Sequence, residues 1–225
     1  MNDEWNNPVL AKEYADKLDQ IDWYEHDVNM PSLLSLVPHD AKRVLDFGSG
    51  PGQFTAKLAQ MYEAVGADSS NAMIEISKHA YPSIEFRQWD GQSPCPFDAE
   101  FNVIFSKLTI HFIEDLAKFA NYASQALAKS GVIIFSVPHP IRTIPKVDGK
   151  YAVTGFYDGA IGKYGLHVQM IHRSFEDYIK PFLENGYALT GLLEPRITEE
   201  QMAQHEAPEE DLYVPKRLNL RFERV

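Results

Sequence analysis

The chain has 225 residues, and its 21 basic and 32 acidic side chains give a formal net charge of −11 with histidine neutral. This length suits one full-sized domain, and the composition, 44% apolar and 24% charged, is that of a folded globular protein and argues against disorder. The acidic balance argues against a broad nucleic-acid-binding face, and no apolar run reaches the roughly 20 residues that a membrane-spanning helix needs.

The N-terminal stretch and the cysteine usage bear on where the protein works. Residues 1–7 are polar and acidic, unlike a secretory signal. Cys95 is the single cysteine, so neither an intrachain disulfide nor a multi-cysteine zinc site can form. We therefore expect a cytoplasmic protein whose partners are small molecules rather than nucleic acid or membrane.

Short apolar runs alternate with helical stretches along most of the chain. In chain order we predict strands over 43–47, 63–68, 84–89, 101–106 and 132–137, with helices over 53–60, 70–79 and 114–128 between them, the last ended by Gly131. A helix over 174–185, a strand over 187–193 and an alternating final strand over 218–222 follow. The acidic stretch 194–211 is interpreted as a solvated surface excursion.

Strand, helix and strand repeated in this way predict an α/β fold, a doubly wound and mostly parallel sheet with helices on both faces. Ligands bind such sheets outside the carboxyl ends of the strands. The functional residues should therefore follow Phe47, Ala67, Trp89, Phe105 and Val137.

Two stretches depart from the repeat. Residues 1–40 contain an amphipathic helix predicted over Pro8–Leu18, and residues 138–173 contain a possible β-ribbon around 151–153 and 166–171. Neither has the pattern of an independent domain. We therefore predict a single domain over 1–225, in which 1–40 is an N-terminal helical lid and 138–173 is a substrate-covering insertion.

A glycine-rich loop follows the first predicted strand. Gly48, Gly50 and Gly52 stand at every second position, and a helix follows. A dinucleotide fold grips its pyrophosphate with Gly-x-Gly-x-x-Gly, whereas here the spacing is Gly-x-Gly-x-Gly and Asp46 lies two residues before the first glycine. Because a carboxylate there repels a diphosphate and can help to hold an ammonium group, the loop favours a cationic, amino-acid-bearing cofactor over NAD.

Two more acids follow the next two predicted strands. Asp68 lies 68 − 48 = 20 residues beyond the first glycine, where an acid can accept both ribose hydroxyls. Asp90, followed by Gly91, can offer an acceptor and a backbone N–H to the edge of adenine. The alternative is a role for these acids in turns and helix caps, but their joint placement at successive strand ends favours a ligand site.

Four motifs follow one another between residues 40 and 137: LDFGSGPG at 45–52, GADSSNAMI at 66–74, WDG at 89–91 and FNVIFS at 101–106. Together they resemble the motifs of class I S-adenosylmethionine-dependent methyltransferases. The segment 172–175, the helix after it and 193–195 are similar, more loosely, to a bacterial small-molecule branch of that family. The resemblance implies seven strands with the last antiparallel and inserted within the sheet, whereas the alternation over 217–223 alone predicts one solvent-facing side.

The resemblance also implies which residues bind S-adenosylmethionine. They are Asp46, Gly48 and Gly50 around the methionine part with Ser49 in the same loop, Ser106 near the amino group, Asp68 at the ribose, Ser69 and Met73 beside the adenine, Asp90 and Gly91 at the adenine edge, and Tyr14 closing over the cofactor.

Methyl transfer from a sulfonium needs an aligned nucleophile and the exclusion of water, and orientation alone supplies roughly 7–11 kcal/mol of barrier reduction. Where the acceptor must also lose a proton, a base is required. His139, at the end of the fifth predicted strand, is the first candidate, and His111, after the fourth, is the second. The alternative for either is a histidine held by backbone near the pocket wall. His167 and His172 have no carboxylate at matching spacing, so no metal is expected.

The acceptor side is less defined by the sequence. Candidates to line it, or merely to pack the lid, are Tyr151, Phe156, Tyr157 and Tyr164; Arg142 and Arg173 either pair with an anionic substrate or are ordinary surface arginines.

We predict a methyltransferase that uses S-adenosylmethionine, releases S-adenosylhomocysteine and acts on a small molecule. The alternative is a non-catalytic S-adenosylmethionine-binding protein, such as a sensor or an assembly subunit. A third possibility, an NAD-dependent dehydrogenase, is disfavoured by the loop.

Overall fold

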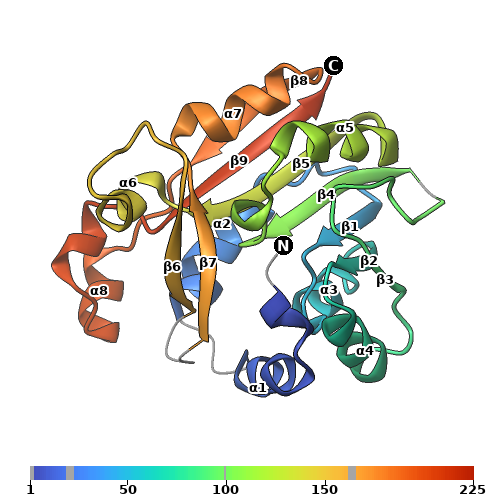
Figure 1. Cartoon of the computed structure of the whole chain (residues 1–225), viewed down its shortest axis with the longest axis horizontal. Coiled ribbons are helices and arrows are strands. Elements are labelled where there is room, and N and C mark those ends of the chain that lie inside the picture. Colours follow the sequence, from blue (N-terminus) through green and yellow to red (C-terminus); the bar gives the residue numbers. More distant parts are fainter. Residues whose placement is uncertain (1–2, 19–22, 99, 162–165) are drawn as a thin grey trace.

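The computed structural model describes residues 3–18, 23–98, 100–161 and 166–225, and the predicted pocket residue Tyr164 lies outside these ranges (Figure 1). A seven-stranded sheet with the order β3-β2-β1-β4-β5-β9-β8 forms its centre. The strands are β1 (Arg43–Phe47), β2 (Glu63–Asp68), β3 (Phe86–Gln88), β4 (Phe101–Lys107), β5 (Leu127–Pro138), β8 (Tyr187–Leu193) and β9 (Arg217–Arg224). Pairing is parallel from β3 through β5, which confirms the predicted doubly wound arrangement.

Helices cover both faces of the sheet. The helical segments are η1 (Asp3–Asn6), α1 (Pro8–Leu18), η2 (Glu25–Asn29, a π-helix), α2 (Met30–Leu34), α3 (Gln53–Leu58), α4 (Asn71–Ala80), η3 (Ile110–Phe112), α5 (Leu116–Ala126), α6 (Pro140–Thr143), η4 (Ile144–Val147), α7 (Phe175–Leu183), α8 (Glu199–His205) and η6 (Glu209–Leu212). On one face, α5 and α7 pack on the larger core cluster, which contains Phe119 and Phe182. On the other, Leu33 of α2 and Leu58 of α3 bury the remaining strand side chains. Apolar side chains project from both faces of the central strands. The sequences of these strands are therefore continuous apolar runs.

The last strand lies inside the sheet. β9 pairs antiparallel with β5 on one side and with β8 on the other. Leu218, Leu220 and Phe222 are fully buried, and so is Asn219 between them, whose Nδ2 donates to Ser32 Oγ at 3.1 Å. The position implied by the family resemblance is therefore correct, and the single solvent-facing side suggested by the alternation is wrong, because a hydrogen-bonded polar residue occupies the second buried face.

Two predicted boundaries are wrong, one at the end of a helix and one at the beginning of the ribbon. α5 ends at Ala126 rather than at the predicted Ala128, because β5 already begins at Leu127. Ser130 takes a left-handed φ of 63° at an irregularity in the β4–β5 pairing. The ribbon consists of β6 (Gly155–Ile161) and β7 (Leu166–His172), so its first strand starts after the predicted 151–153. The N-terminal helix matches its predicted bounds.

The stretch 194–211 is not merely a solvated excursion, as predicted. It forms α8 and η6, and the Asp211 carboxylate is buried between two cations, 2.7 Å from Arg142 and 2.7 Å from Lys216. Glu194 lies 2.7 Å from His139. Acidic residues from this stretch therefore fix the end of β5 and the beginning of β9.

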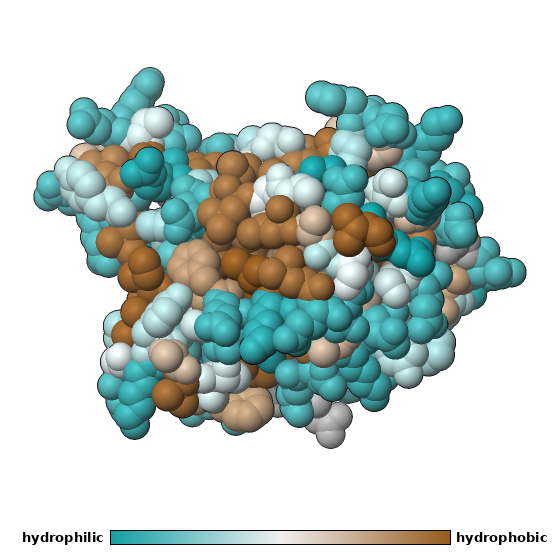
Figure 2. Space-filling model, turned by 90° about the horizontal axis from the view of Figure 1, so that it is seen from above, coloured by the Kyte–Doolittle hydropathy of each residue, from teal (hydrophilic) through white to brown (hydrophobic). Residues whose placement is uncertain are grey.

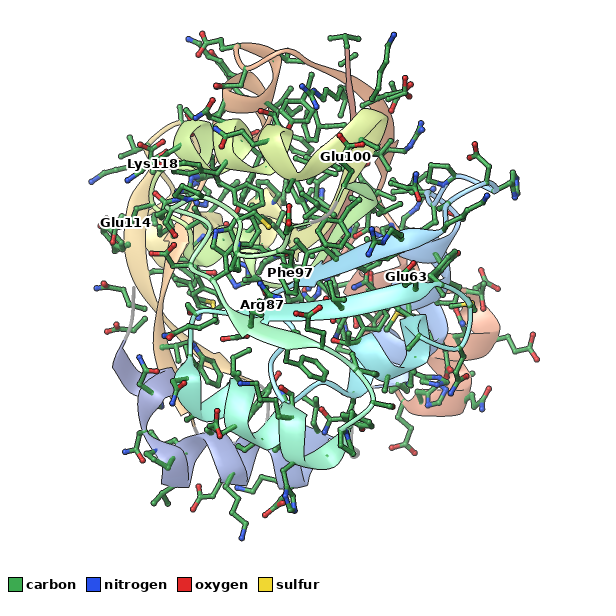
Figure 3. The ribbon with its side chains drawn as sticks, turned by 90° about the vertical axis from the view of Figure 1, so that its right-hand side faces the viewer. Glu63, Arg87, Phe97, Glu100, Glu114 and Lys118 are labelled. Carbon is green, nitrogen blue, oxygen red and sulfur yellow. The ribbon has the colours of Figure 1, made fainter. Side chains whose placement is uncertain are left out.

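The loop after β3 covers one edge of the sheet. At the β3 edge, seen in Figure 3, the Arg87 guanidinium lies 5.1 Å from the centre of the Phe97 ring and donates to Pro96 O, so the loop after β3 covers that edge. Seen from above, the side on which Figure 1 labels α7, β8 and α5, the molecule shows hydrophobic residues in a band bordered by hydrophilic ones (Figure 2). None of the helices in the described ranges has the length and apolar composition needed to cross a membrane.

Candidate functional site

A cavity of about 490 Å³ lies at the carboxyl ends of the parallel strands. The ends of β1, β2, β4 and β5 contribute to its wall, and so does Arg217 at the beginning of β9, because an antiparallel strand starts at the edge where its neighbours end. The β6–β7 ribbon stands across this end of the sheet in Figure 1, and Tyr157, Gly159 and Met170 from the ribbon complete the wall. The site therefore lies where doubly wound sheets bind their ligands.

The glycine loop forms the floor of one half of the cavity. Hydrogen bonds from the N–H groups of Gly48 and Ser49 to Ala67 O, at 2.7 and 2.9 Å, bind the loop to β2. Gly48 and Gly50 both have positive φ, 77° and 53°, which glycine adopts without strain. A Cβ at Gly48 would lie 2.0 Å from Thr109 Oγ1, whereas a Cβ at Gly50 would meet no atom within 4 Å. The backbone at Gly50 is therefore bare on the side where the cavity lies.

Asp68 lies beside this loop and lines the cavity. Its Oδ2 accepts the N–H of Gly50 at 2.8 Å, and its Oδ1 accepts the N–H of Ser70 at 2.9 Å. Burial raises the pKa of Asp68, although these backbone donors oppose the rise. The carboxylate thus joins the loop to the beginning of α4, with lone pairs left on both oxygens for a ligand.

Asp46 has a different setting from the one predicted. It is 1% exposed, does not line the cavity, and its Oδ2 accepts the hydroxyl of Thr55 at 2.6 Å. Burial raises its pKa to about 7, against the lowering effects of Thr55 and Lys107. The side chain lies beneath the loop, so in this structure it acts on the loop and on Lys107 rather than touching the cavity.

Four more sequence-predicted residues do not line the cavity: Ser49, Asp90, Gly91 and Ser106. Asp90 Oδ1 accepts hydrogen bonds from the Gln92 N–H and the Ser93 hydroxyl, so this oxygen stabilises the turn that contains Asp90. A Cβ at Gly91 would lie 2.7 Å from Phe119. The hydroxyls of Ser49 and Ser106 are buried without a hydrogen-bond partner. In place of Asp90, the preceding Trp89 reaches the wall.

The N-terminal segment closes the cavity over α4. Trp5 and Tyr14 line it, with their ring centres 5.2 Å apart and their planes near perpendicular. The Ser70 hydroxyl donates to Trp5 O at 2.5 Å, which fastens η1 to the N-terminus of α4. Ser69 and Met73 line the same part of the wall. The structure therefore brings together Tyr14, Gly48, Gly50, Asp68, Ser69 and Met73 from the predicted cofactor set.

The two candidate bases have opposite placements. His111 lines the cavity, its Nδ1 is buried without a partner, and burial together with the nearby cations of Arg217 and Arg173 lowers its pKa to about 3. His139 is fully buried and does not line the cavity. Its Nδ1 accepts the Ile141 N–H at 3.3 Å, and its Nε2 lies 2.7 Å from Glu194 Oε1.

His139 therefore caps α6 and, contrary to the sequence-based expectation, is separated from the cavity. Both ring nitrogens are occupied, one as an acceptor and the other as a donor, which identifies the neutral imidazole. Burial lowers the pKa of His139 despite the opposing effect of Glu194, which keeps the ring neutral.

Of the residues predicted around the acceptor, Tyr157 and Arg142 line the cavity. Tyr151 accepts the Phe175 N–H through its hydroxyl, Phe156 is 57% exposed, and Arg173 donates to Ile113 O and Glu114 O. These three residues hold or cover the lid without reaching the cavity.

Sequence reasoning missed several cavity residues, chiefly Trp5, Lys107, Thr109, Lys146 and Arg217. Lys107 ends β4 and follows Ser106 directly, so attention to strand ends could have found it. Arg217 could be found only by knowing that β9 runs antiparallel. Its Nε donates to Glu25 Oε1 at 2.7 Å, across 192 residues of sequence.

The described residues contain no group of three or more His, Cys, Asp or Glu side chains arranged to hold a metal ion. What the cavity offers is a glycine-backed floor, the carboxylate of Asp68, an aromatic and thioether wall, and a second half with several cations.

Comparisons with known proteins agree with this arrangement. Residues 45–135 match a family model described as a methyltransferase domain. Over 139 residues the chain is 30% identical to a trans-aconitate 2-methyltransferase of Variovorax paradoxus, a match that covers 60% of this chain and 50% of the relative. The chain spans about half the length of the curated relatives that it matches.

Solved structures share the fold. A protein of Listeria monocytogenes described as an S-adenosylmethionine-dependent methyltransferase superposes with a TM-score of 0.73 at 24% identity, covering 87% of this chain and 96% of the other. An S-adenosylmethionine-dependent methyltransferase of Mesorhizobium loti gives a TM-score of 0.69, also at 24% identity, with 86% and 96% covered. The similarity therefore extends beyond the matched domain to most of the described chain.

Proposed function

We propose that this chain, a member of the class I S-adenosylmethionine-dependent methyltransferase family, transfers a methyl group to a small-molecule acceptor bound in the second half of its cavity. The observation that carries the proposal is the continuity of one cavity from Gly50 and Asp68, at the ends of β1 and β2, to Arg142, Lys146 and Tyr157 on the far side. A cofactor and an acceptor can therefore meet inside a single cavity.

The residues present fit S-adenosylmethionine on three observations. Gly50 leaves open space against its backbone, so a ligand can contact the main chain there. Asp68 presents two carboxylate oxygens that can accept ribose hydroxyls. Met73, Trp89 and Tyr14 supply the apolar and aromatic surface that an adenine ring needs. When bound, the cofactor would supply a methyl group on a positively charged sulfur.

Five other residues of the predicted set have indirect roles in this proposal. Asp46 holds Thr55 beneath the loop, and Asp90 with Gly91 shapes the turn that presents Trp89. The buried hydroxyls of Ser49 and Ser106 lie in the loop and at the end of β4, where a bound ligand would order their surroundings.

The protein's main contribution would be orientation and the exclusion of water. The lid segments 1–40 and 138–173 supply Trp5 and Tyr14 on one side and Arg142 and Tyr157 on the other. Positioning of two reactants in a closed site accounts for a large share of rate enhancement without a covalent catalyst. His111 is the candidate to accept a hydrogen bond from the acceptor, and its low pKa keeps the imidazole neutral at physiological pH.

The acceptor is a small molecule in this proposal. The cavity of about 490 Å³ must hold cofactor and acceptor together, which favours a compact acceptor. The name of the Variovorax relative makes trans-aconitate the first acceptor to test. The net charge of −11 supports a protein that does not bind nucleic acid, and the single cysteine supports a cytoplasmic location.

The experiment that tests the proposal combines binding with product formation. Calorimetric titration should give saturable binding of S-adenosylmethionine and S-adenosylhomocysteine and none of NAD. Incubation with S-adenosylmethionine labelled in its methyl group, and a panel of acceptors led by trans-aconitate, should then move label into product. Tight cofactor binding without transfer to any acceptor would favour the non-catalytic alternative, and preference for NAD would overturn the proposal.

A further inference from the structure

Positive side chains gather in the half of the cavity that faces away from Asp68. Lys107 ends β4, Arg142 lies on α6, Lys146 on η4 and Arg217 at the beginning of β9, and all four line the cavity. Asp68 is the single carboxylate among the described lining residues, and it belongs to the other half. This half is locally cationic in a chain whose formal charge is −11, so the sign is not a consequence of composition.

Arg217 is held in place by a buried acid. Glu25, 6% exposed on the π-helical turn η2, accepts from Arg217 Nε at 2.7 Å, and Asn29 Nδ2 donates to its other oxygen at 2.8 Å. Burial alone would raise the pKa of Glu25, but Arg217, Lys107 and Asn29 together lower it below its ordinary value. Glu25 is therefore ionised and orients the guanidinium, whose charge it largely balances.

Arg142 is also paired outside the cavity. Its Nη2 donates to Asp211 Oδ1 at 2.7 Å and to Val214 O at 2.6 Å, while its Nε is buried without a hydrogen-bond partner. Lys216 contacts the second oxygen of Asp211. The guanidinium is rigidly placed by these contacts, and one of its donors remains available for a ligand.

Lys107 and Lys146 form no such direct ion pair. Within the described part of the chain, no carboxylate lies within 4.0 Å of either ammonium group. Lys107 is half-buried, and its positive charge interacts with the carboxylates of Asp46 and Glu25. Its charge therefore lies between the two halves of the cavity. Lys146 is exposed at the rim. Lys107 therefore shares the charges of Glu25 and Asp46 without a direct ion pair, whereas Lys146 has no ion-pair partner in the described part of the chain.

We propose that the acceptor is a small polycarboxylate, bound through Lys107, Lys146 and the preorganised guanidinium groups of Arg142 and Arg217. The inference rests on the proposed function, since it names the substrate class for the acceptor half of that same cavity. Four cations at separate places on the wall, with no lining carboxylate in the same half of the cavity within the described residues, match an anion with more than one carboxylate better than a single charge. The neutral His111 has one ring N–H that can donate a hydrogen bond to a carboxylate, whereas the Tyr157 hydroxyl donates to Met170 Sδ at 3.3 Å.

The test uses calorimetry on the protein saturated with S-adenosylhomocysteine. The probes are citrate, tricarballylate and succinate, and trimethyl tricarballylate is the uncharged counterpart of similar shape. The tricarboxylates should bind, the neutral ester should not, and binding should weaken as sodium chloride is raised. Lys107→Gln and Lys146→Gln should each weaken tricarballylate binding about tenfold or more, since a hydrogen bond to a charged group contributes that much.

Lys118→Gln is the matched control, because Lys118 is exposed on α5 and does not line the cavity, and Figure 3 shows it on the outer surface. It should bind tricarballylate as the unchanged protein does. Lys146 is exposed, so its variant keeps the test valid even where Lys107→Gln disturbs folding. Equal binding of acid and ester, no binding of any carboxylate probe, or equal loss in Lys118→Gln would overturn the inference while cofactor binding and methyl transfer stand. Failure to bind S-adenosylhomocysteine at all would overturn the proposed function and the inference with it.

Discussion

Replacing Gly50 by alanine separates the requirement for glycine in the fold from its requirement in the site. Gly50 has a φ of 53°, and a Cβ there would meet no protein atom within 4 Å. An L-residue in this left-handed conformation costs about 1–2 kcal/mol, and no clash adds to that figure. We therefore expect Gly50→Ala to fold, with an unfolding free energy lower by about that amount.

Gly50→Ala should lose more free energy of cofactor binding than of unfolding. The added methyl group enters the space in which the loop meets its ligand, and overpacking of a well-fitted contact costs about 1–3 kcal/mol, or roughly tenfold to a hundredfold in affinity. Gly186→Ala is the matched control, since Gly186 has a φ of 79°, also has no atom within 4 Å of a Cβ, and follows α7 outside the cavity.

Urea unfolding and calorimetric titration with S-adenosylhomocysteine measure the two effects. Both variants should lose similar stability, and only Gly50→Ala should lose affinity. If Gly50→Ala binds as tightly as the unchanged protein, the loop is not the cofactor floor. If both variants lose affinity equally, the loss comes from general destabilisation, and the geometric reasoning fails.

Three other perturbations address the remaining residues of the site. Asp68→Asn should weaken S-adenosylhomocysteine binding at least tenfold by calorimetry, because a charged acceptor is lost, and an unchanged dissociation constant would remove Asp68 from the site. The pKa of His111 is about 3 in the folded chain against 6.5 as its ordinary value, so its contribution to stability is complete above pH 6.5 and is lost as the pH falls towards 3. Urea unfolding at pH 5 and 7 should then show a smaller loss on acidification in His111→Gln, and an equal loss in both proteins would contradict this. His139→Ala should lower the unfolding free energy by about 1–3 kcal/mol, because a cap and a buried hydrogen bond disappear, with S-adenosylhomocysteine affinity kept; reduced turnover at full stability would instead support a catalytic His139.

Much of the fold follows from periodicity in the sequence. The strand β1, the helix α1 and the crossover order could be predicted because apolar runs and helical spacing change at each glycine or cap. The family motifs added the inserted position of β9, which alternation alone misassigned. The boundary at Ala126 could not be predicted, since a turn inside a bulged strand has no distinct apolar pattern.

The position of the candidate site could be predicted from the sequence, but the directions in which its side chains point could not. Asp68 and Asp90 both follow strands, but one carboxylate lines the cavity and the other hydrogen-bonds to its own turn. His139 likewise stands at a strand end and is turned away by capping α6. Such directions depend on local hydrogen bonds. Lys107 and Arg217 were missed because their role depends on strands that are neighbours only in the folded sheet.

The place of β9 has a consequence for biosynthesis. β8 can join the sheet only when β9 lies between it and β5, and β9 also carries Arg217. A nascent chain emerging from the ribosome can form the glycine loop and its neighbouring strands long before residues 217–224 are available. The cofactor half can thus be assembled first, while the half that would receive the acceptor stays incomplete until the last strand is threaded in.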